Sequence, residues 1–322
     1  MTTSLGDIWV WHYTLQSKAV LNARFESLEH RGALIRDFGG GVGCIHPWTS
    51  LGDASLEDQL ASLASGHPLP LAEQALVCAE FDGLARRDGV NLFDKLTVPI
   101  PKSHWTASPA HDPASVVGEG FGAVKIKCGP DMTVNRSEIE RWQTAGPDLR
   151  LRLDFNETGT VDALTGFWGD LAEPDRGAIE FIEDPVPWDK ATWQELRKAG
   201  IPLAADRDAL GRADEADWLV VKPGAENPVR AGEKAYETGS RLVFTSYMDH
   251  AIGQVYAAFR AGEWAGVFPE QVSECGLLTH ELFEPDPFFE RLCREGPQLL
   301  PPTGTGLGFD DLLESLPWKK MT

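Results

Sequence analysis

Apolar and polar residues follow one pattern in the first hundred residues and another in the rest of the chain. Residues 7–14 and 31–37 alternate between the two classes, which predicts antiparallel strands. Residues 56–65 and 71–87 carry apolar side chains at helical spacing, which predicts two helices. We therefore expect residues 1–98 to form a small α+β domain.

A glycine-rich segment, residues 39–43, interrupts the strands of this first domain. We expect it to be a loop, because so many glycines cannot sustain a strand or a helix. We also expect this loop to become ordered over a bound ligand. Residues 98–101 (VPIP) then mark the end of the domain, because two prolines break any continuing element.

From about residue 102 onward, predicted strands alternate with predicted helices. The strands are expected near His104 and at residues 123–128, 149–156, 179–184, 202–206, 218–222, 242–246 and 273–277. This alternation implies parallel strands joined by right-handed crossovers, and eight strands favour a closed barrel over an open sheet. We therefore predict an α/β fold with a TIM-type barrel over residues 99–285. Residues 286–322 are expected to return to the first domain.

Polar residues stand at the C-terminal ends of successive predicted strands, where barrel enzymes carry their catalytic groups. They are Lys125 and Lys127, then Asp154, Glu183, Asp206 and Lys222, separated by about one strand and helix each. Three carboxylates aimed at one point do not all stay ionised without a cation between them. Oxygen ligands with open positions suit Mg²⁺, with Mn²⁺ as a possible substitute. The sequence therefore predicts a metal site at this end of the barrel.

The two lysines at positions 125 and 127 point the same way, because they lie two residues apart on a strand. We expect a lysine beside a divalent cation to have a lowered pKa and to act as a general base. Removal of a proton next to a carboxylate needs such a base, and it needs a metal for the charge that develops on the oxygens. Each strand-end carboxylate alone could equally be a helix cap. The order along successive strands favours the catalytic interpretation.

Composition and charge exclude several classes of function. The chain has 29 Lys+Arg and 49 Asp+Glu among 322 residues, which gives a formal net charge of −20. Such a surface repels phosphate backbones and anionic lipids, so we expect neither nucleic acid nor membrane as a partner. The predicted base and metal site indicate a small-molecule carboxylate as the substrate instead. Residues 1–7 lack the features of a signal peptide, and the five scattered cysteines contain no C-x-x-C motif. A cytoplasmic location is therefore expected.

The segments AVKIK, LRLDFNE, EFIEDP, LAADRD and VVKP resemble the enolase superfamily, in its muconate-lactonizing-enzyme-like branch. The pair Arg152 and Asp154, and the stretches 41–53, 245–253 and 273–278, are similar to the o-succinylbenzoate synthase family of menaquinone biosynthesis. The resemblance implies a (β/α)7β barrel without its eighth helix, covered by the N-terminal capping domain. It also implies a Mg²⁺-dependent lyase that dehydrates 2-succinyl-6-hydroxy-2,4-cyclohexadiene-1-carboxylate to 2-succinylbenzoate.

The resemblance also implies a role for each residue of the series. Lys127 would remove the proton alpha to the carboxylate and then protonate the departing hydroxide. Lys222 would stabilise the enediolate from the opposite face, and Lys125 would contact the substrate carboxylate. The metal ligands would be Asp154, Glu183 and Asp206, and the substrate-binding residues would be Arg152, Asn156, Ser246 and Gly276.

The sequence departs from the family pattern after the third ligand. Arg207 stands where many relatives have an acidic residue, and Asp208 is a possible additional metal ligand. The segment before Lys222 is short, so little helix is expected there. His46 is interpreted either as part of a turn or as a lining of the site. His250 is interpreted either as a neighbour of the substrate or as a helix cap.

Two other functions stay open at this point. A dipeptide epimerase or N-acylamino acid racemase of the same superfamily would exchange protons through both Lys127 and Lys222, and Asp249 could then bind an amine. A non-catalytic metal-binding barrel is the alternative of a different class. It predicts the loss of a lysine or a ligand, and this sequence keeps them all.

Overall fold

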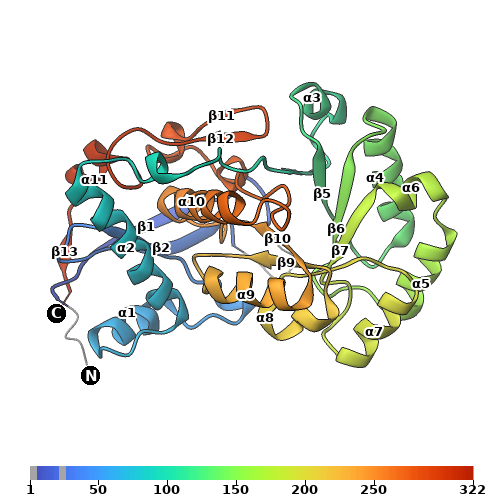
Figure 1. Ribbon diagram of the computed structural model, residues 1–322, viewed down its shortest axis with the longest axis horizontal. Helices are drawn as coiled ribbons and strands as arrows, with labels where there is room; N and C mark the ends of the chain where they lie inside the picture. The colour runs from blue at the N-terminus through green and yellow to red at the C-terminus, as the bar shows by residue number, and fades with distance from the viewer. Residues whose placement is uncertain (1–5, 22–26, 322) are drawn as a thin grey trace.

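The computed structural model describes residues 6–21 and 27–321. Residues 1–5, which are part of the basis for the signal-peptide expectation, lie outside the described residues. A four-stranded antiparallel sheet occupies one side of the molecule, and a larger parallel sheet surrounded by helices occupies the other (Figure 1). Among the described residues, no helix has both the length and the apolar character that crossing a membrane requires.

The antiparallel sheet carries the first residues and the last residues of the described chain. Its strands are β1 (Trp9–Gln16), β2 (Glu29–Arg36), β3 (Val42–Ile45) and β13 (Lys319–Lys320), in the order β13-β1-β2-β3. Helices α1 (Leu56–Ala64) and α2 (Pro70–Asp88) follow these strands. Ser55 caps α1 by accepting a hydrogen bond from the Asp58 N–H, and α2 begins with proline at its first turn.

The glycine-rich segment is only partly a loop, so the prediction of a loop over residues 39–43 is wrong at its C-terminal end. Strand β3 begins at Val42 and includes Gly43. A Cβ atom at Gly43 would lie 1.9 Å from the carbonyl oxygen of Ala75, and one at Gly41 would lie 1.9 Å from that of Ala79. The glycines therefore let α2 approach the backbone of this segment closely.

We expect the substitution Gly43→Ala to lower the free energy of unfolding by about 3 kcal/mol, because the new methyl group must displace helix α2. Urea unfolding followed by circular dichroism measures the change. Gly166→Ala is the control, because Gly166 lies in α5 (Val161–Asp170) and a Cβ atom there meets no atom within 4 Å. That control should be neutral or slightly stabilising. Equal stability of Gly43→Ala and the parent would contradict the packing argument.

The parallel sheet has seven strands whose order in space follows their order in the chain. The strands are β4 (Trp105–Thr106), β5 (Ala123–Lys127), β6 (Arg150–Asp154), β7 (Ile179–Glu183), β8 (Leu203–Ala205), β9 (Trp218–Val221) and β10 (Arg241–Phe244). The surrounding helices are α3 (Pro113–Gly118), α4 (Met132–Ala145), α5, α6 (Glu173–Ala178), α7 (Lys190–Lys198), α8 (Ala209–Arg212), α9 (Pro228–Thr238) and α10 (Ala251–Val267). The short α8 confirms that little helix precedes Lys222.

The predicted last strand, residues 273–277, forms isolated bridges that connect the two edges of this sheet. On one side, Ser273 N donates to the Leu242 carbonyl at 2.8 Å and Gly276 N donates to the Phe244 carbonyl at 2.7 Å. On the other side, His104 N donates to the Cys275 carbonyl at 2.8 Å. The predicted barrel architecture is thereby confirmed, with this segment in the place of the eighth strand.

After the barrel, the described chain forms short turns and a hairpin where a complete barrel would have its eighth helix. The elements are the 3-10 turns Thr279–Leu282 and Phe289–Arg291, the strands β11 (Cys293–Glu295) and β12 (Gln298–Leu300), and helix α11 (Asp310–Ser315). The chain then reaches α2, where Leu307 N donates to Asp82 at 2.6 Å. It ends on β1 through the pairing of β13 (Figure 1).

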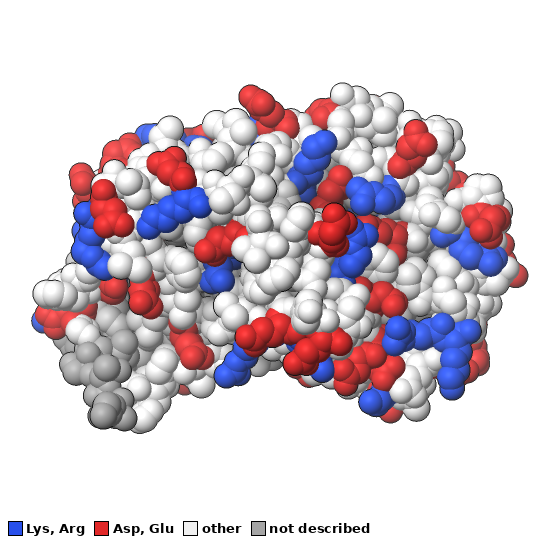
Figure 2. Space-filling model, in the orientation of Figure 1, with Lys and Arg blue, Asp and Glu red and all other residues white. Residues whose placement is uncertain are grey.

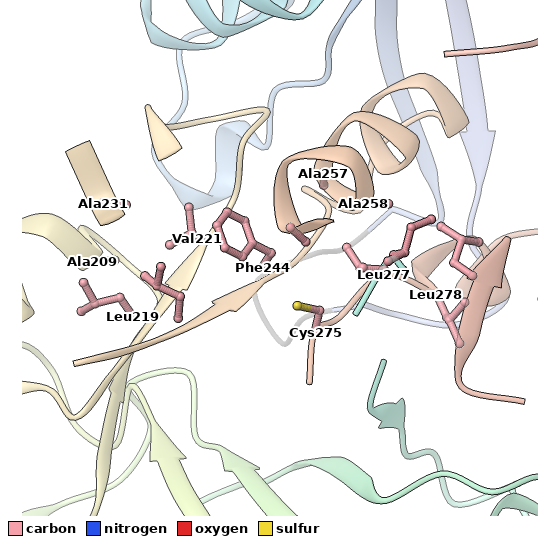
Figure 3. Close-up of a cluster of buried hydrophobic side chains, with 14 of the residues drawn as sticks. Ala209, Leu219, Val221, Ala231, Phe244, Ala257, Ala258, Cys275, Leu277 and Leu278 are labelled. Atoms are coloured by element: carbon pink, nitrogen blue, oxygen red, sulfur yellow. The ribbon is translucent and has the colours of Figure 1, made fainter. Parts of the chain in front are cut away.

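Alternate residues of the barrel strands face two different environments. Leu219, Val221 and Phe244 face the surrounding helices (Figure 3), where they pack in one large apolar cluster with Ala231, Ala257 and Ala258. Residues one position along face the other way and form a separate buried cluster of Phe181, Ala204, Val220 and Val243. Because side chains alternate along a strand, this second cluster marks the interior of the barrel.

The surface carries both signs of charge despite the excess of carboxylates. On the face shown in Figure 2, basic and acidic side chains are interspersed, and acidic side chains gather along the lower edge where α8 and α9 lie. Acidic side chains on this face are thus exposed to solvent, where net charge favours solubility.

Candidate active site

The interior residues of the barrel strands continue directly into the predicted site residues. Glu183 lies two positions after Phe181, Asp206 two after Ala204, and Lys222 two after Val220, so each pair shares the inward face. The strand register aligns Lys127 with Asp154, and Asp154 with Glu183, across β5, β6 and β7. The polar residues at the strand ends therefore meet at one rim of the barrel, as the sequence predicted.

A cavity of about 890 Å³ opens above this rim. Its lining includes the predicted site residues Lys125, Lys127, Asp154, Asn156, Asp206, Lys222, Ser246 and Gly276, as well as Asp208. Glu183 lies beneath the cavity floor with 2% of its surface exposed. Lys125, which lines the cavity, forms an ion pair with the Glu183 carboxylate.

Lysine ammonium groups contact each of the three carboxylates. Lys125 Nζ lies 2.6 Å from Glu183 Oε1 and 3.0 Å from Asp154 Oδ2. Lys127 Nζ also contacts Asp154 Oδ2, and Lys222 Nζ contacts Asp206 Oδ1. Burial of so many charges is tolerated because each has a partner of opposite sign.

These ion pairs raise the pKa values of Lys125 and Lys222. Burial favours the neutral amine of Lys125, but the carboxylates of Asp154 and Glu183 outweigh it and raise its pKa. The pKa of Lys222 is likewise raised, because Asp206 outweighs the effect of burial. The lowered pKa was expected for a lysine beside a divalent cation, and it stays a prediction, because here the carboxylates contact the lysines directly.

The carboxylates respond unequally to the same surroundings. Burial, together with the nearby charges of Asp154 and Asp206, raises the pKa of Glu183 to about 7. Burial also opposes ionisation of Asp154, but Lys125 and Lys127 outweigh it and lower the pKa of that carboxyl. Burial and the repulsion by the other two carboxylates therefore both oppose ionisation of Glu183.

The donor set fits a hard divalent cation, because it consists of carboxylate oxygens on three adjacent strand ends. Burial and the neighbouring carboxylates raise the pKa of Glu183, and a cation bound beside it would favour its ionised form. Within the described parts of the chain, no three His, Cys, Asp or Glu side chains are already grouped as a metal site. The carboxylate oxygens contact lysine ammonium groups instead.

A second layer of charged residues supports the rim, and most of it was missed by the sequence interpretation. The carboxylate of Asp184 accepts hydrogen bonds from the backbone N–H groups of Asp206 and Arg207, both at 3.2 Å. Arg212 donates to Asp184 at 3.3 Å and to Glu157 at 2.9 Å. The sequence shows charged residues after each proposed ligand, but it does not show which of them form ion pairs with one another.

Ser246 and Gly276 lie next to each other in the wall of the cavity. Ser246 N donates to the Gly276 carbonyl at 3.3 Å, and the Ser246 hydroxyl hydrogen-bonds with Thr279. A Cβ atom at Gly276 would lie 2.8 Å from the Thr245 hydroxyl oxygen, so glycine keeps this wall open. This part of the wall presents backbone and hydroxyl groups to a ligand.

The capping domain reaches the barrel rim next to Ser246. Trp48 Nε1 donates to the Tyr247 carbonyl at 2.7 Å, and the Tyr247 hydroxyl donates to Asp53 at 2.8 Å. Leu51, from the same loop, lines the cavity. The glycine-rich residues 39–43 do not line it, so the expectation that they cover a ligand is wrong. They pack against α2 instead.

Arg152 does not line the cavity, which corrects its predicted contact with the substrate. Its side chain is fully buried, donates to Glu180 at 2.6 Å and to the Glu274 carbonyl at 2.7 Å, and contacts His104 Nδ1. Arg152 lies one inward-facing position below Asp154 on β6. Its interactions tie the base of the site together rather than forming its surface.

Other cavity-lining residues were not singled out by the sequence analysis. They include Lys18, Trp105, Glu226, Tyr247, Met248 and Leu278. Glu226 accepts a hydrogen bond from Lys222 N at 3.1 Å, and burial raises its pKa to about 7. Apart from Trp105 on β4, these residues come from segments between strands and helices, and the barrel and the capping domain together bring them to one cavity.

The two histidines of uncertain role lie behind the cavity wall. His46 hydrogen-bonds with the Tyr13 hydroxyl at 2.9 Å, and His250 caps α10 by accepting from Ile252 N at 3.2 Å. Neither histidine lines the cavity, and neither does Asp249. His250 is thus a helix cap, and Asp249 is not in a position to bind the amine of a dipeptide.

This buried cluster makes stability depend on pH. Burial lowers the pKa of His46 and of His250 to about 3. In the unfolded chain each takes up a proton near pH 6.5, so stability falls as pH drops below 6.5, by about 1.4 kcal/mol per unit for each. Asp249 acts in the opposite sense, because burial raises its pKa to about 7 and the folded state keeps its proton.

We expect His250→Asn to remove one of these contributions, because asparagine keeps the helix cap but does not titrate. Between pH 6 and pH 5 the variant should lose about 1 kcal/mol less stability than the parent, measured by urea unfolding at each pH. His67→Asn is the control, because His67 is exposed, and it should lose as much as the parent. An equal loss in all three proteins would contradict the assignment.

Two family models match this chain. The model described as "O-succinylbenzoate synthase, N-terminal domain" matches residues 8–85, which contain the antiparallel strands β1 to β3 and most of α2. The model described as "Enolase C-terminal domain-like" matches residues 110–221, which contain β5 to β9. The two matches thus cover the capping sheet and the ligand-bearing strands separately.

Individual relatives extend the similarity to the whole chain. The o-succinylbenzoate synthase of Bdellovibrio bacteriovorus is 34% identical over 321 residues, which cover 96% of this chain and 97% of the relative. The o-succinylbenzoate synthase of Thermobifida fusca is 26% identical over 208 residues, covering 59% of this chain and 62% of the relative.

Solved structures agree on the architecture. A mandelate racemase/muconate lactonizing protein from Herpetosiphon aurantiacus has a TM-score of 0.76 and 16% identity, covering 96% of this chain and 98% of that chain. A dipeptide epimerase from Cytophaga hutchinsonii has a TM-score of 0.76 and 18% identity, covering 98% and 99%. At these identities the structures show the fold alone. The full-length relative shows more, and the chain belongs to the o-succinylbenzoate synthase family of enzymes within the enolase superfamily.

Proposed function

We propose that this protein catalyses the o-succinylbenzoate synthase reaction of menaquinone biosynthesis. It would dehydrate 2-succinyl-6-hydroxy-2,4-cyclohexadiene-1-carboxylate to 2-succinylbenzoate with the help of Mg²⁺. The observation that carries the proposal is the full-length similarity to the Bdellovibrio bacteriovorus enzyme, in a chain whose three lysines line one cavity with Asp154 and Asp206 while Glu183 is buried next to Lys125. We propose a cytoplasmic location as well, with which the five free cysteines agree.

The proposed chemistry begins with Lys127, whose side chain is 43% exposed to the cavity. As a neutral amine it would take the proton alpha to the substrate carboxylate, and as an ammonium group it would then protonate the departing hydroxide on the same face. Lys222 would stabilise the enediolate from across the cavity as a cation. A divalent cation held by Asp154, Glu183 and Asp206 would supply positive charge for the carboxylate oxygens.

The remaining residues would orient the substrate. Lys125 would contact the ring carboxylate, because its ammonium group lies between two of the proposed ligands and lines the cavity. Asn156, Ser246 and Gly276 would contact the rest of the molecule, and the hydroxyl and backbone groups near Ser246 suit the succinyl arm. Asp208 also lines the cavity, where it could assist the cation.

The experiment is a direct assay of dehydration with purified protein, the cyclohexadiene substrate and Mg²⁺, followed by the loss of diene absorbance. Turnover is the expected result, and its absence with an intact fold would refute the proposal. A parallel incubation of N-acylated amino acids and dipeptides in deuterated water tests for epimerase or racemase activity, because only proton exchange at the alpha carbon incorporates deuterium. Exchange without dehydration would favour that alternative.

A further inference from the structure

Five charged or polar residues link the three strand ends that carry the proposed metal ligands. They are Asn156 and Glu157 after β6, Asp184 after β7, and Arg207 and Arg212 after β8; we call this set the rim clasp. None of them is one of the three proposed ligands. Each strand end contributes at least one member, so the rim clasp spans the site from side to side.

Asp184 forms the centre of the rim clasp and holds the third proposed ligand directly. Its two carboxylate oxygens accept the N–H groups of Asp206 and Arg207, each at 3.2 Å. Asp184 N donates to the Ala204 carbonyl at 3.0 Å, which fixes Asp184 against β8 from its backbone as well. The position of the Asp206 backbone is therefore set by the side chain that follows Glu183.

Two arginines connect this centre to the first strand end. Arg212 bridges two carboxylates, donating to Asp184 at 3.3 Å and to Glu157 at 2.9 Å. Arg207 donates to Glu157 at 3.2 Å and to the Asn156 side-chain oxygen at 2.6 Å. The Arg212 guanidinium also lies over the rings of Trp188 and Trp193.

The backbone at these strand ends adopts a conformation that needs outside support. Asn156, Glu157, Asp184 and Asp208 all have positive φ angles, of 48°, 63°, 40° and 46°. Side chains other than glycine rarely adopt this region, and such residues persist where surrounding contacts hold them. The hydrogen bonds and ion pairs of the rim clasp are the contacts that hold three of the four.

We propose that the rim clasp positions Asp206 for metal binding and thereby sets the affinity of the site for divalent cations. This inference rests on the proposed metal role of Asp206. Apart from Asn156, which is also a proposed substrate contact, its residues would act on the site through Asp206, so they are positioning residues. Arg207 has a specific part in it, because an acidic residue there would repel Glu157 instead of binding it.

The test measures Mn²⁺ binding, by the electron paramagnetic resonance signal of free Mn²⁺, in the parent and in Arg212→Gln, Arg207→Gln and Asp184→Asn. We expect Kd for Mn²⁺ to rise by about 10- to 100-fold for Arg212→Gln, as is typical when support of a ligand is lost. Activity should show a higher Mg²⁺ requirement, with kcat recovered at saturating Mg²⁺. A catalytic role would instead lower kcat at every Mg²⁺ concentration.

Arg86→Gln is the matched control. Arg86 is a similarly buried arginine that bridges two carboxylates, Asp82 and Asp310, in the capping part of the molecule. A general effect on stability would lower the melting temperature in both arginine variants, but only Arg212→Gln should weaken Mn²⁺ binding. If Arg212→Gln does not fold, Arg212→Lys keeps a charge but cannot bridge both carboxylates in the same way, and the same shift in Kd is expected.

Two outcomes would overturn the inference, and they differ from each other. Mn²⁺ affinity within twofold of the parent in Arg212→Gln and Asp184→Asn would refute the rim clasp and leave the proposed function intact. Failure of the parent to bind Mn²⁺ would refute the metal role of Asp206, and the inference would fall with it.

Discussion

Replacement of Lys127 by alanine should lower the rate of dehydration by about 10⁴-fold, at the upper end of what general acid–base groups contribute. Lys127 is the one member of the lysine pair on β5 with a large exposed fraction, 43%, and it meets the cavity above Asp154. Its removal deletes both the proposed base and the proposed acid. Loss of diene absorbance under saturating Mg²⁺ measures the rate, and thermal unfolding reports whether the fold is kept.

Two further variants separate proton transfer from charge. Lys127→Arg keeps the positive charge, but a guanidinium group stays protonated and cannot act as a base, so this variant should be nearly as slow as Lys127→Ala. Lys198→Ala, at the exposed end of α7, should retain full activity. Turnover of Lys127→Arg close to that of the parent would show that Lys127 acts through its charge, and the proposed base would have to be sought elsewhere.

The sequence predicted the barrel well because its strands are short apolar runs with helices at regular spacing. The segment at residues 218–222, predicted as a strand from its sequence, contains strand β9 from Trp218 to Val221. The glycine-rich strand β3 was missed for a reason outside local sequence. Gly43 is needed where α2 approaches, and the approach of a helix to a strand is a tertiary contact.

The site residues show what the alternation of side chains along a strand cannot predict. Residues two apart on a strand share a face, but they lie about 6.6 Å apart in depth. Lys125 and Arg152 are register partners on the same level, yet Lys125 reaches up to Glu183 whereas Arg152 turns to Glu180. The alternation of side chains predicted both to face inward. Only the packed barrel determined which one reaches the cavity.

The direction of the lysine pKa shifts could not be predicted for a related reason. The sequence placed lysines and carboxylates at one rim, and the expectation of lowered pKa values assumed that a cation lies between them. In the structure Lys125 and Lys222 contact the carboxylates themselves, which raises their pKa values. The carboxylates thus favour the ammonium form of the lysines that they contact. A cation bound to the carboxylates would oppose that effect and favour the neutral amine.

Removal of divalent cations with a chelator should abolish dehydration, and added Mg²⁺ should restore it. In the proposed mechanism the enediolate needs positive charge beside its oxygens. Asp154, Glu183 and Asp206 are anionic, so they would supply it only through the cation that they hold. Glu183→Gln should prevent restoration at any accessible Mg²⁺ concentration, because it removes one of three anionic ligands. The assay of dehydration and the rise in melting temperature on addition of Mg²⁺ both report the result.

Binding of the cation should also depend on pH in a defined direction. Burial and the neighbouring carboxylates raise the pKa of Glu183 to about 7, so a proton competes with the cation below that pH. Because ligands must be deprotonated to bind, affinity should increase as the pH rises from 6 to 8. Below pH 7 it should fall by up to about tenfold per pH unit, as expected for the release of one proton.

Glu180→Gln is the matched control for Glu183→Gln, because both residues lie on β7 and both are buried in ion pairs. Glu180 pairs with Arg150 and Arg152 below the cavity and does not line it. Its substitution should lower the melting temperature, yet the rise on addition of Mg²⁺ should be as large as in the parent. The opposite result would be a Mg²⁺-induced rise in melting temperature that persists in Glu183→Gln but is lost in Glu180→Gln. It would place the cation below the cavity and would contradict the proposed metal site.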